Sequence, residues 1–175
     1  MGNEDARVED RFAIIDAIHR YCHGVDRCDI ETLQSAFWED ATDDHGAGAE
    51  PAHAWAVGLL EALKTMRCTQ HAVSNIMVNF ESAIKARAQT YCVAYHQFDV
   101  DDAPQEMVVG GRYLDVLEKR GDAWKISSRI YVMDWNRNTP SAAIWEGGLY
   151  DQLKYRGLRF PDDLSRDYAG VGKKT

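Results

Sequence analysis

The sequence has 175 residues and a mass of 19.8 kDa, which suits a single domain of ordinary size. A hydrophobic fraction of 45% and a charged fraction of 27% are typical of a globular protein and exclude wholesale disorder and fibrous repeats. The net charge of −8 argues against nucleic acid or an anionic membrane as the main partner, because both favour a basic surface.

Helical periodicity marks the first part of the chain. Apolar residues recur at helical spacing and predict a first helix from about Asn3 to Gly24, where glycine can end it. Asp29 can cap a short second helix, and Pro51 can begin a third. A short strand is possible at Thr42–His45.

After the third helix the apolar period changes from 3.6 to 2, which is typical of β-strands. A tight turn at Arg120–Asp122 joins the last two strands, and a longer hairpin loop ends at Pro104. Helices followed by an antiparallel meander predict an α+β fold, with the helices packed on one face of a curved sheet. The expected strands are Thr69–Phe80, Ala83–Phe98, Met107–Lys119 and Ala123–Trp135.

The chain is expected to form one α+β domain over residues 1–135, followed by a separate segment over residues 136–175. The segment is slightly basic and too apolar to be a free tail, so it should dock on the domain as irregular or partly helical structure. The N-terminal stretch MGNEDARVED has no apolar core, and no apolar run reaches the length of a membrane span. The four cysteines lack CxxC spacing, so we expect reduced thiols and a cytoplasmic location.

Three polar residues stand out from their surroundings. Asp26 follows the end of the first helix, where the helix dipole disfavours a carboxylate, and it is either a turn residue or a partner for a buried group. Tyr21 lies on the apolar side of that helix, so its hydroxyl needs a partner inside. His71 and Arg129 lie in strand segments, and each faces either solvent or an enclosed pocket.

Three segments in order, AIIDAIHRYCHGVDRCDIETLQSAFWEDAT, TQHAVSN and VVGGRYLDVLEKRGDAWKISSR, resemble the SnoaL-like branch of the nuclear-transport-factor-2-like superfamily over about residues 8–135. Members include scytalone dehydratase, bile-acid 7α-dehydratase and hexachlorocyclohexane dehydrochlorinase. The resemblance implies a cone of curved antiparallel sheet, with N-terminal helices that close a deep pocket. It also implies a trimer formed through the outer sheet face, and a C-terminal segment, residues 136–175 here, that packs near the pocket mouth and can cover it.

The resemblance gives roles to particular residues. In this group an Asp at the end of the first helix orients a His on the following strand, which acts as the base; Asp26 and His71 match these positions. Arg129 matches an Arg of the final strand. Tyr21 stands where the bile-acid enzyme has Tyr and the dehydrochlorinase has Lys, which favours loss of water.

The chemistry of these residue types supports those roles. Removal of a proton beside an activating group needs a base that works near neutral pH, and a carboxylate on the other ring nitrogen fixes its tautomer. Tyr21 and Arg129 can stabilise a leaving hydroxide or an enolate. Scytalone dehydratase uses a second pocket His, for which His45 and His96 are the candidates here, and either can be purely structural.

The sequence therefore predicts a cofactor-independent lyase, a dehydratase acting on a hydrophobic alicyclic or aromatic small molecule. Alternatives are an isomerase or carbon–carbon lyase with the same residues, a non-catalytic binding or assembly module, and the small subunit of a ring-hydroxylating dioxygenase. No metal site is expected, because no helical His pair accompanies the ATDDHG stretch. The expected substrate contacts are Trp55, Tyr113, Met133 and Trp135.

One face of the strand segment Thr69–Phe80 is also notable. Strict alternation places Ala72, Ser74, Ile76, Val78 and Phe80 together, opposite His71. An apolar sheet face away from the pocket would suit a buried contact between subunits.

Overall fold

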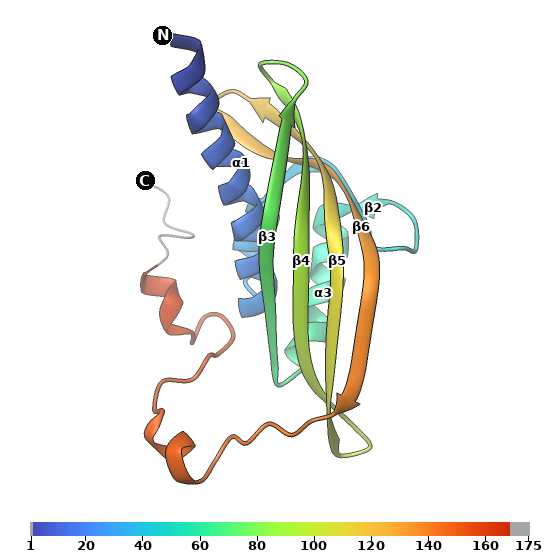
Figure 1. Ribbon diagram of the computed structural model, residues 1–175, viewed down its shortest axis with the longest axis vertical. Helices are drawn as coiled ribbons and strands as arrows, with labels where there is room; N and C mark the ends of the chain where they lie inside the picture. Colours follow the sequence, from blue (N-terminus) through green and yellow to red (C-terminus); the bar gives the residue numbers. More distant parts are fainter. Residues whose placement is uncertain (1, 169–175) are drawn as a thin grey trace.

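The computed structural model describes residues 2–168, and the side chains of residues 2–6 lie outside that description. The helices lie against a curved, unclosed sheet of six strands (Figure 1), which confirms the predicted α+β class. The strand order is β2-β1-β6-β5-β4-β3, and the pairs are antiparallel except for the parallel pair β1–β6. The elements are α1 (Gly2–Arg27), α2 (Ile30–Ser35), β1 (Phe37–Asp44), β2 (Glu50–Pro51), α3 (Ala52–Lys64), β3 (Cys68–Phe80), β4 (Lys85–Val100), β5 (Ala103–Arg120) and β6 (Ala123–Pro140).

The core lies between the helices and the concave face of the sheet. Ile14, Ile18, Tyr21 and Val25 of the predicted apolar face of α1 are buried there, and α3 adds a second row. Val8 and Phe12, which the same pattern placed on that face, are exposed. Strand β4 meets the helices with small residues at alternate positions, which lets the helices approach the sheet closely. The core-facing residues of β4 are Ala86, Ala88, Thr90, Cys92, Ala94 and His96.

Helix α1 does not stop at Gly24, as the sequence had suggested, but continues to Arg27. Cys28 has a positive φ of 52°, and the Asp29 N–H donates to the Gly24 carbonyl, so the reversal comes four residues after the glycine. A Cβ on Gly24 would lie 2.5 Å from the backbone nitrogen of Leu33. The glycine is therefore needed for the close packing of α1 on α2, and Asp26 falls in the last turn of the longer helix.

A bulge in β3 decides which side chains face the core. Its register against β4 shifts between Ser74 and Met77, and Asn75 has a positive φ of 49°. Strict alternation is therefore wrong for this strand, because the extra residue changes the face beyond the bulge. The residues on the core side are His71 and Val73 before the bulge, and Ile76, Val78 and Phe80 after it.

The strands are longer than the sequence pattern indicated. The expected long loop before Pro104 is a two-residue turn, since Asp101 and Asp102 both have positive φ and the pairing begins again at Ala103. The expected turn at Gly121 is present, with a φ of 62°. Strand β6 continues past Trp135 to Pro140 and pairs with β5 over this length.

After β6 the chain runs away from the sheet and then returns beside α1 (Figure 1). It contains two short 3-10 helices, η1 (Gly148–Gln152) and η2 (Leu164–Asp167). The Phe160 N–H donates to the Arg27 carbonyl at 2.6 Å, and Asp163 forms an ion pair with Arg27. The described part of the segment is thus attached to the C-terminal end of α1.

Candidate functional site

A cavity of about 140 Å³ lies between the helices and the concave face of the sheet. Most of its wall is aromatic or apolar, and the polar groups that reach it are histidines and tyrosines. A pocket of this composition is typical of small-molecule sites. Its lining residues are Tyr21, Val25, His45, Trp55, Leu59, Leu63, His71, Cys92, Ala94, His96, Val109, Tyr113 and Tyr131.

Asp26 and His71 form a two-point contact at one end of this cavity. The Nδ1 atom of His71 lies 2.7 Å from Asp26 Oδ1, and the backbone N–H of His71 donates to Oδ2 at 2.7 Å. Both side chains are nearly buried, with 10% and 12% exposure. The carboxylate therefore holds the ring through Nδ1 and leaves Nε2 available as the basic nitrogen.

The pKa of Asp26 reflects these contacts. Burial acts to raise it, but the hydrogen bonds from the ring and backbone of His71 outweigh burial and lower the pKa below its ordinary value. Asp26 is therefore a carboxylate at neutral pH. It can stabilise positive charge on the imidazole beside it.

A second histidine packs against the first. The rings of His71 and His96 meet edge to face, with centroids 5.4 Å apart. Burial, followed by the adjacent positive charge of protonated His71, lowers the pKa of His96 to about 4. His96 is therefore neutral at pH 7 and acts as an uncharged neighbour of His71.

Arg129 lies beneath the cavity and does not line it. The side chain is fully buried and makes a bidentate ion pair with Asp115, with both N–O distances 2.7 Å. Its guanidinium carbon lies 4.0 Å from the ring centres of Tyr21 and Tyr113, both of which do line the cavity. Burial raises the pKa of each of these tyrosines well above its ordinary value, so both stay phenols.

A further acid–imidazole contact lies at the end of β1, where His45 is the first residue after the strand. Asp43 Oδ1 meets His45 Nδ1, and His45 Nε2 lies 3.5 Å from the Tyr21 hydroxyl. The His45 ring stacks on Trp55 with centroids 4.3 Å apart. Two of the six histidines in the sequence therefore reach this cavity with a carboxylate on Nδ1.

The structure brings together Tyr21, Asp26, His71, Trp55 and Tyr113, but it separates the other two expected substrate contacts from the cavity. Met133 and Trp135 do not line it and are 56% and 49% exposed.

A register shift explains the position of Trp135. The pairing of β5 with β6 changes register between Gly110 and Gly111, so Trp135 lies on the outer face of the sheet, beside Gly110. Met133 pairs with Gly111 and lies outside the cavity. A Cβ on Gly110 would lie 2.1 Å from the Trp135 indole, so the ring covers this glycine. Strict alternation from Arg129 predicts both side chains on one face, and the register shift is the reason that they differ.

Sequence reasoning missed several cavity residues. Tyr131 follows Arg129 on the same face and could have been chosen from alternation alone. Cys92 and Ala94 could have been found from a different pattern, the small residues at alternate positions of β4. Such residues mark the strand face on which helices pack closely.

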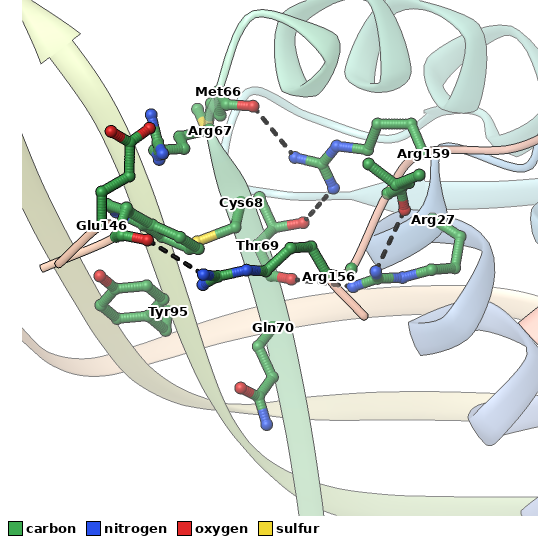
Figure 2. Close-up of a pocket in the computed structure, with 13 residues that line it drawn as sticks. Arg27, Met66, Arg67, Cys68, Thr69, Gln70, Tyr95, Glu146, Arg156 and Arg159 are labelled. Carbon is green, nitrogen blue, oxygen red and sulfur yellow. Dashed lines mark hydrogen bonds between the residues drawn. The ribbon is translucent and has the colours of Figure 1, made fainter. Parts of the chain in front are cut away.

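A larger cavity, of about 750 Å³, lies under the C-terminal segment. Figure 2 shows Arg27, Arg156 and Arg159 directed toward backbone carbonyls instead of converging on one point. Arg159 donates to the carbonyls of Asp26, Leu63 and Met66, and Arg156 donates to carbonyls within its own segment. Arg159 therefore fastens the segment to the domain, whereas Arg156 holds the segment's own fold.

The described residues, 2–168, include no cluster of three or more side chains suited to hold a metal ion. Within the same range, no helix combines the length and apolarity that a membrane crossing requires.

Comparisons with known proteins agree with this architecture. The model of the SnoaL-like domain family matches residues 6–130. No curated protein sequence matches the chain. Similar solved structures include a type 2 hexachlorocyclohexane dehydrochlorinase (LinA), 24% identical with a TM-score of 0.71 over 84% of this chain and 99% of that one.

Two further solved structures come from Novosphingobium aromaticivorans. A candidate scytalone dehydratase is 21% identical, with a TM-score of 0.70 over 83% of this chain and 99% of that one. A candidate aromatic ring hydroxylase is 25% identical, with a TM-score of 0.62 over 77% of this chain and 94% of that one. The family match confirms the resemblance drawn from the sequence, and these likenesses confirm the fold.

Proposed function

This chain belongs to the SnoaL-like domain family, and we propose that it is a cofactor-independent lyase, a dehydratase that acts on a hydrophobic alicyclic or aromatic small molecule. The observation that carries the proposal is the contact between Asp26 and His71 at the wall of an aromatic cavity. The similarity to a dehydrochlorinase and to a candidate scytalone dehydratase supports elimination as the reaction class.

In the proposed reaction, His71 Nε2 removes a proton from the carbon beside an activating group such as a carbonyl. Asp26 keeps the ring in the required tautomer and stabilises the imidazolium that forms. The neutral state of His96 keeps a second positive charge away from that imidazolium. A base of this kind contributes about 10²–10⁴-fold to the rate.

Departure of the hydroxyl group needs a hydrogen-bond donor on the other side of the substrate. Tyr21 lines the cavity and keeps its phenolic proton, so it can donate to the leaving oxygen. Arg129 acts through Tyr21 and Tyr113, because its charge lies beneath both rings and it does not reach the cavity itself. Trp55 and Tyr113 provide flat apolar surfaces for a ring-shaped substrate.

The test uses β-hydroxycyclohexanone and β-hydroxytetralone as one-ring and two-ring probes, with product formation followed by the absorbance of the conjugated product. His71→Gln should lower turnover by about 10²–10⁴-fold without unfolding the chain. His19→Gln is the matched control, because His19 is exposed on α1 and does not line the cavity.

Unchanged turnover in the His71 variant would contradict the proposed base. Nuclear magnetic resonance of the products separates dehydration from isomerisation, since an isomerase would move the double bond or carbonyl and release no water. Circular dichroism of each variant checks that the fold is retained.

A further inference from the structure

We propose that Asp43 and His45 form a second acid–base pair in the same cavity, which delivers the proton that the leaving hydroxyl group needs, through the hydroxyl of Tyr21. This inference rests on the proposed function, because it assigns the other half of the elimination catalysed by His71.

The first support is the burial of Asp43. Its side chain has no exposed surface, yet it faces the cavity side of β1 and meets His45 Nδ1 through Oδ1. Its Oδ2 atom accepts no hydrogen bond from the residues that the structure describes. Burial of a carboxylate costs folding free energy unless another group pairs with it, and His45 is the group that Asp43 contacts.

The second support is the orientation of the His45 ring. Asp43 holds it at Nδ1, and its stacking on Trp55 and on Tyr131, with centroids 4.3 and 5.1 Å away, fixes the plane of the ring. Nε2 therefore faces the Tyr21 hydroxyl at 3.5 Å. Neutral His45 accepts a hydrogen bond from Tyr21, and protonated His45 donates one to it.

The third support is the chemistry of Tyr21. Burial raises the pKa of this phenol well above its ordinary value, so a tyrosine that gave up its proton unaided would leave a costly phenolate inside the protein. A proton held on His45 next to it removes that cost. Tyr21 can then donate to the substrate and be reprotonated in the same step.

The proton and electron balance is complete without a cofactor. The C–H bond breaks as His71 Nε2 takes the proton, and its electron pair forms the C=C bond. The C–O bond breaks, and the leaving oxygen takes the Tyr21 proton while Tyr21 takes the proton of protonated His45. The products are the unsaturated compound and water, and one proton lost to solvent from His71 and one gained by His45 restore the site.

The groups that surround His45 come from five elements. Asp43 on β1 is the carboxylate in contact, Tyr21 faces it from α1, Trp55 from α3, Tyr113 from β5 and Tyr131 from β6. Burial raises the pKa of all three tyrosines, so none of them titrates near neutral pH. Arg129 lies beyond the Tyr21 and Tyr113 rings and is paired with Asp115.

The experiment separates the two halves of the reaction. Cyclohexanone has the acidic C–H bond but no leaving group, so its deuterium exchange needs His71 alone, whereas water loss from β-hydroxycyclohexanone needs both pairs. In His45→Gln we expect water loss to fall by about 10²-fold or more, while exchange stays within about threefold of the wild-type rate. His71→Gln should lose both activities, and His19→Gln should lose neither.

The ratio of the two activities supplies a readout that a purely structural role would not change. Asp43→Asn, a change at the positioning residue, should lower water loss as His45→Gln does and leave exchange within about threefold of the wild-type rate. A change that only disturbed the structure of the cavity would lower both activities.

Each outcome is decisive. Water loss by His45→Gln within about threefold of wild type overturns the relay and leaves the proposed function standing. Absence of both exchange and water loss in the wild type overturns both. If His45→Gln fails to fold, nitrogen-15 resonance spectra of the wild-type imidazoles decide, because the relay requires neutral His45 to carry its proton on Nδ1 and a proton on Nε2 overturns it.

Discussion

At the scale of single residues, the partner of each imidazole sets what it can do. His71 and His45 each have a carboxylate on Nδ1, so either can carry a proton with its charge balanced. His96 has no such partner among the described residues, and its Nδ1 is buried without a hydrogen bond. His45, His71 and His96 line the same small cavity but differ in function, because only the first two have a carboxylate on Nδ1.

His96 should make stability depend on pH in a defined window. The pKa of this group falls from 6.5 to about 4 on folding, so between these values the unfolded chain binds more protons than the folded one. Stability should therefore decrease as the pH falls from 6.5 to 4, by at most about 3 kcal/mol.

Thermal melting of the wild type and of His96→Gln across this range measures the effect, and the variant should show the flatter dependence. Asp26 acts in a separate, lower window, because its lowered pKa costs stability only as the pH falls below the ordinary range of a carboxyl group. Equal slopes for the two proteins between pH 6.5 and 4 would exclude His96 as the cause.

At the scale of elements, the contact between α1 and α2 positions Asp26. Gly24 allows the two helices to approach until Leu33 lies where a Cβ would be. Gly24→Ala should therefore destabilise the protein by about 1–3 kcal/mol and impair His71-dependent turnover, since α1 must shift. Gly58→Ala on α3 is the control, because open space surrounds that position and alanine should stabilise the helix by about 0.5–1 kcal/mol.

Chemical denaturation gives both free energies of unfolding. A Gly24→Ala protein as stable as the wild type would show that α1 and α2 can separate without cost.

Much of this element structure follows from the sequence, and the exceptions have a common cause. Helix periodicity and strand alternation placed the main elements, and Asp29 caps α2 as expected, with its side chain accepting from the Thr32 N–H. Alternation failed at Asn75 in β3 and between Met133 and Trp135 in β6, where the register shifts. A bulge inverts every later side chain in a strand, and a single sequence contains no partner strand against which to detect it.

The candidate site, too, was only partly predictable from the sequence. The pairing of Asp26 with His71 came from resemblance, because no local pattern joins residues from α1 and β3. The pairing of Asp43 with His45 was not anticipated, since the acidic stretch around it has the composition of a solvated loop. Asp43 is buried because β1 pairs in parallel with β6, a long-range contact that composition does not indicate.

At the scale of the whole molecule, the convex side of the sheet carries an exposed apolar surface. A groove of about 550 Å³ crosses it, with Met77, Leu114 and Ile130 in its wall. Ile76, Val78 and Phe80, which strict alternation assigns to a subunit contact, pack inward against the core and cannot form that contact. The exposed apolar residues of the convex side are Met77, Tyr91, Val93, Leu114, Ile130 and Trp135.

We propose that this surface joins three copies of the chain, as the family resemblance implies. Light scattering coupled to gel filtration should give three times the 19.8 kDa mass of one chain. The double change Leu114→Glu and Ile130→Glu should give single chains that remain folded, because both side chains face outward. A wild-type chain that elutes alone would contradict the trimer.

The C-terminal segment was expected to cover the pocket mouth. None of its described residues lines the cavity of His71, and its contacts lie beside that cavity, at the end of α1. Its role as a cover stays a prediction. The contacts anchor the segment to the domain, because Arg159 donates hydrogen bonds to carbonyls of α1, of α3 and of the turn that follows α3.

The two acid–imidazole pairs differ in how far apart their members lie along the chain. Asp43 and His45 are two positions apart, whereas Asp26 and His71 are 45 apart. The first pair needs only one strand and the loop after it, but the second exists only while α1 is docked on β3. Any opening of that helix would take Asp26 away from His71 and Tyr21 away from His45 at the same time, so docking of α1 on β3 is itself the condition for a reactive site.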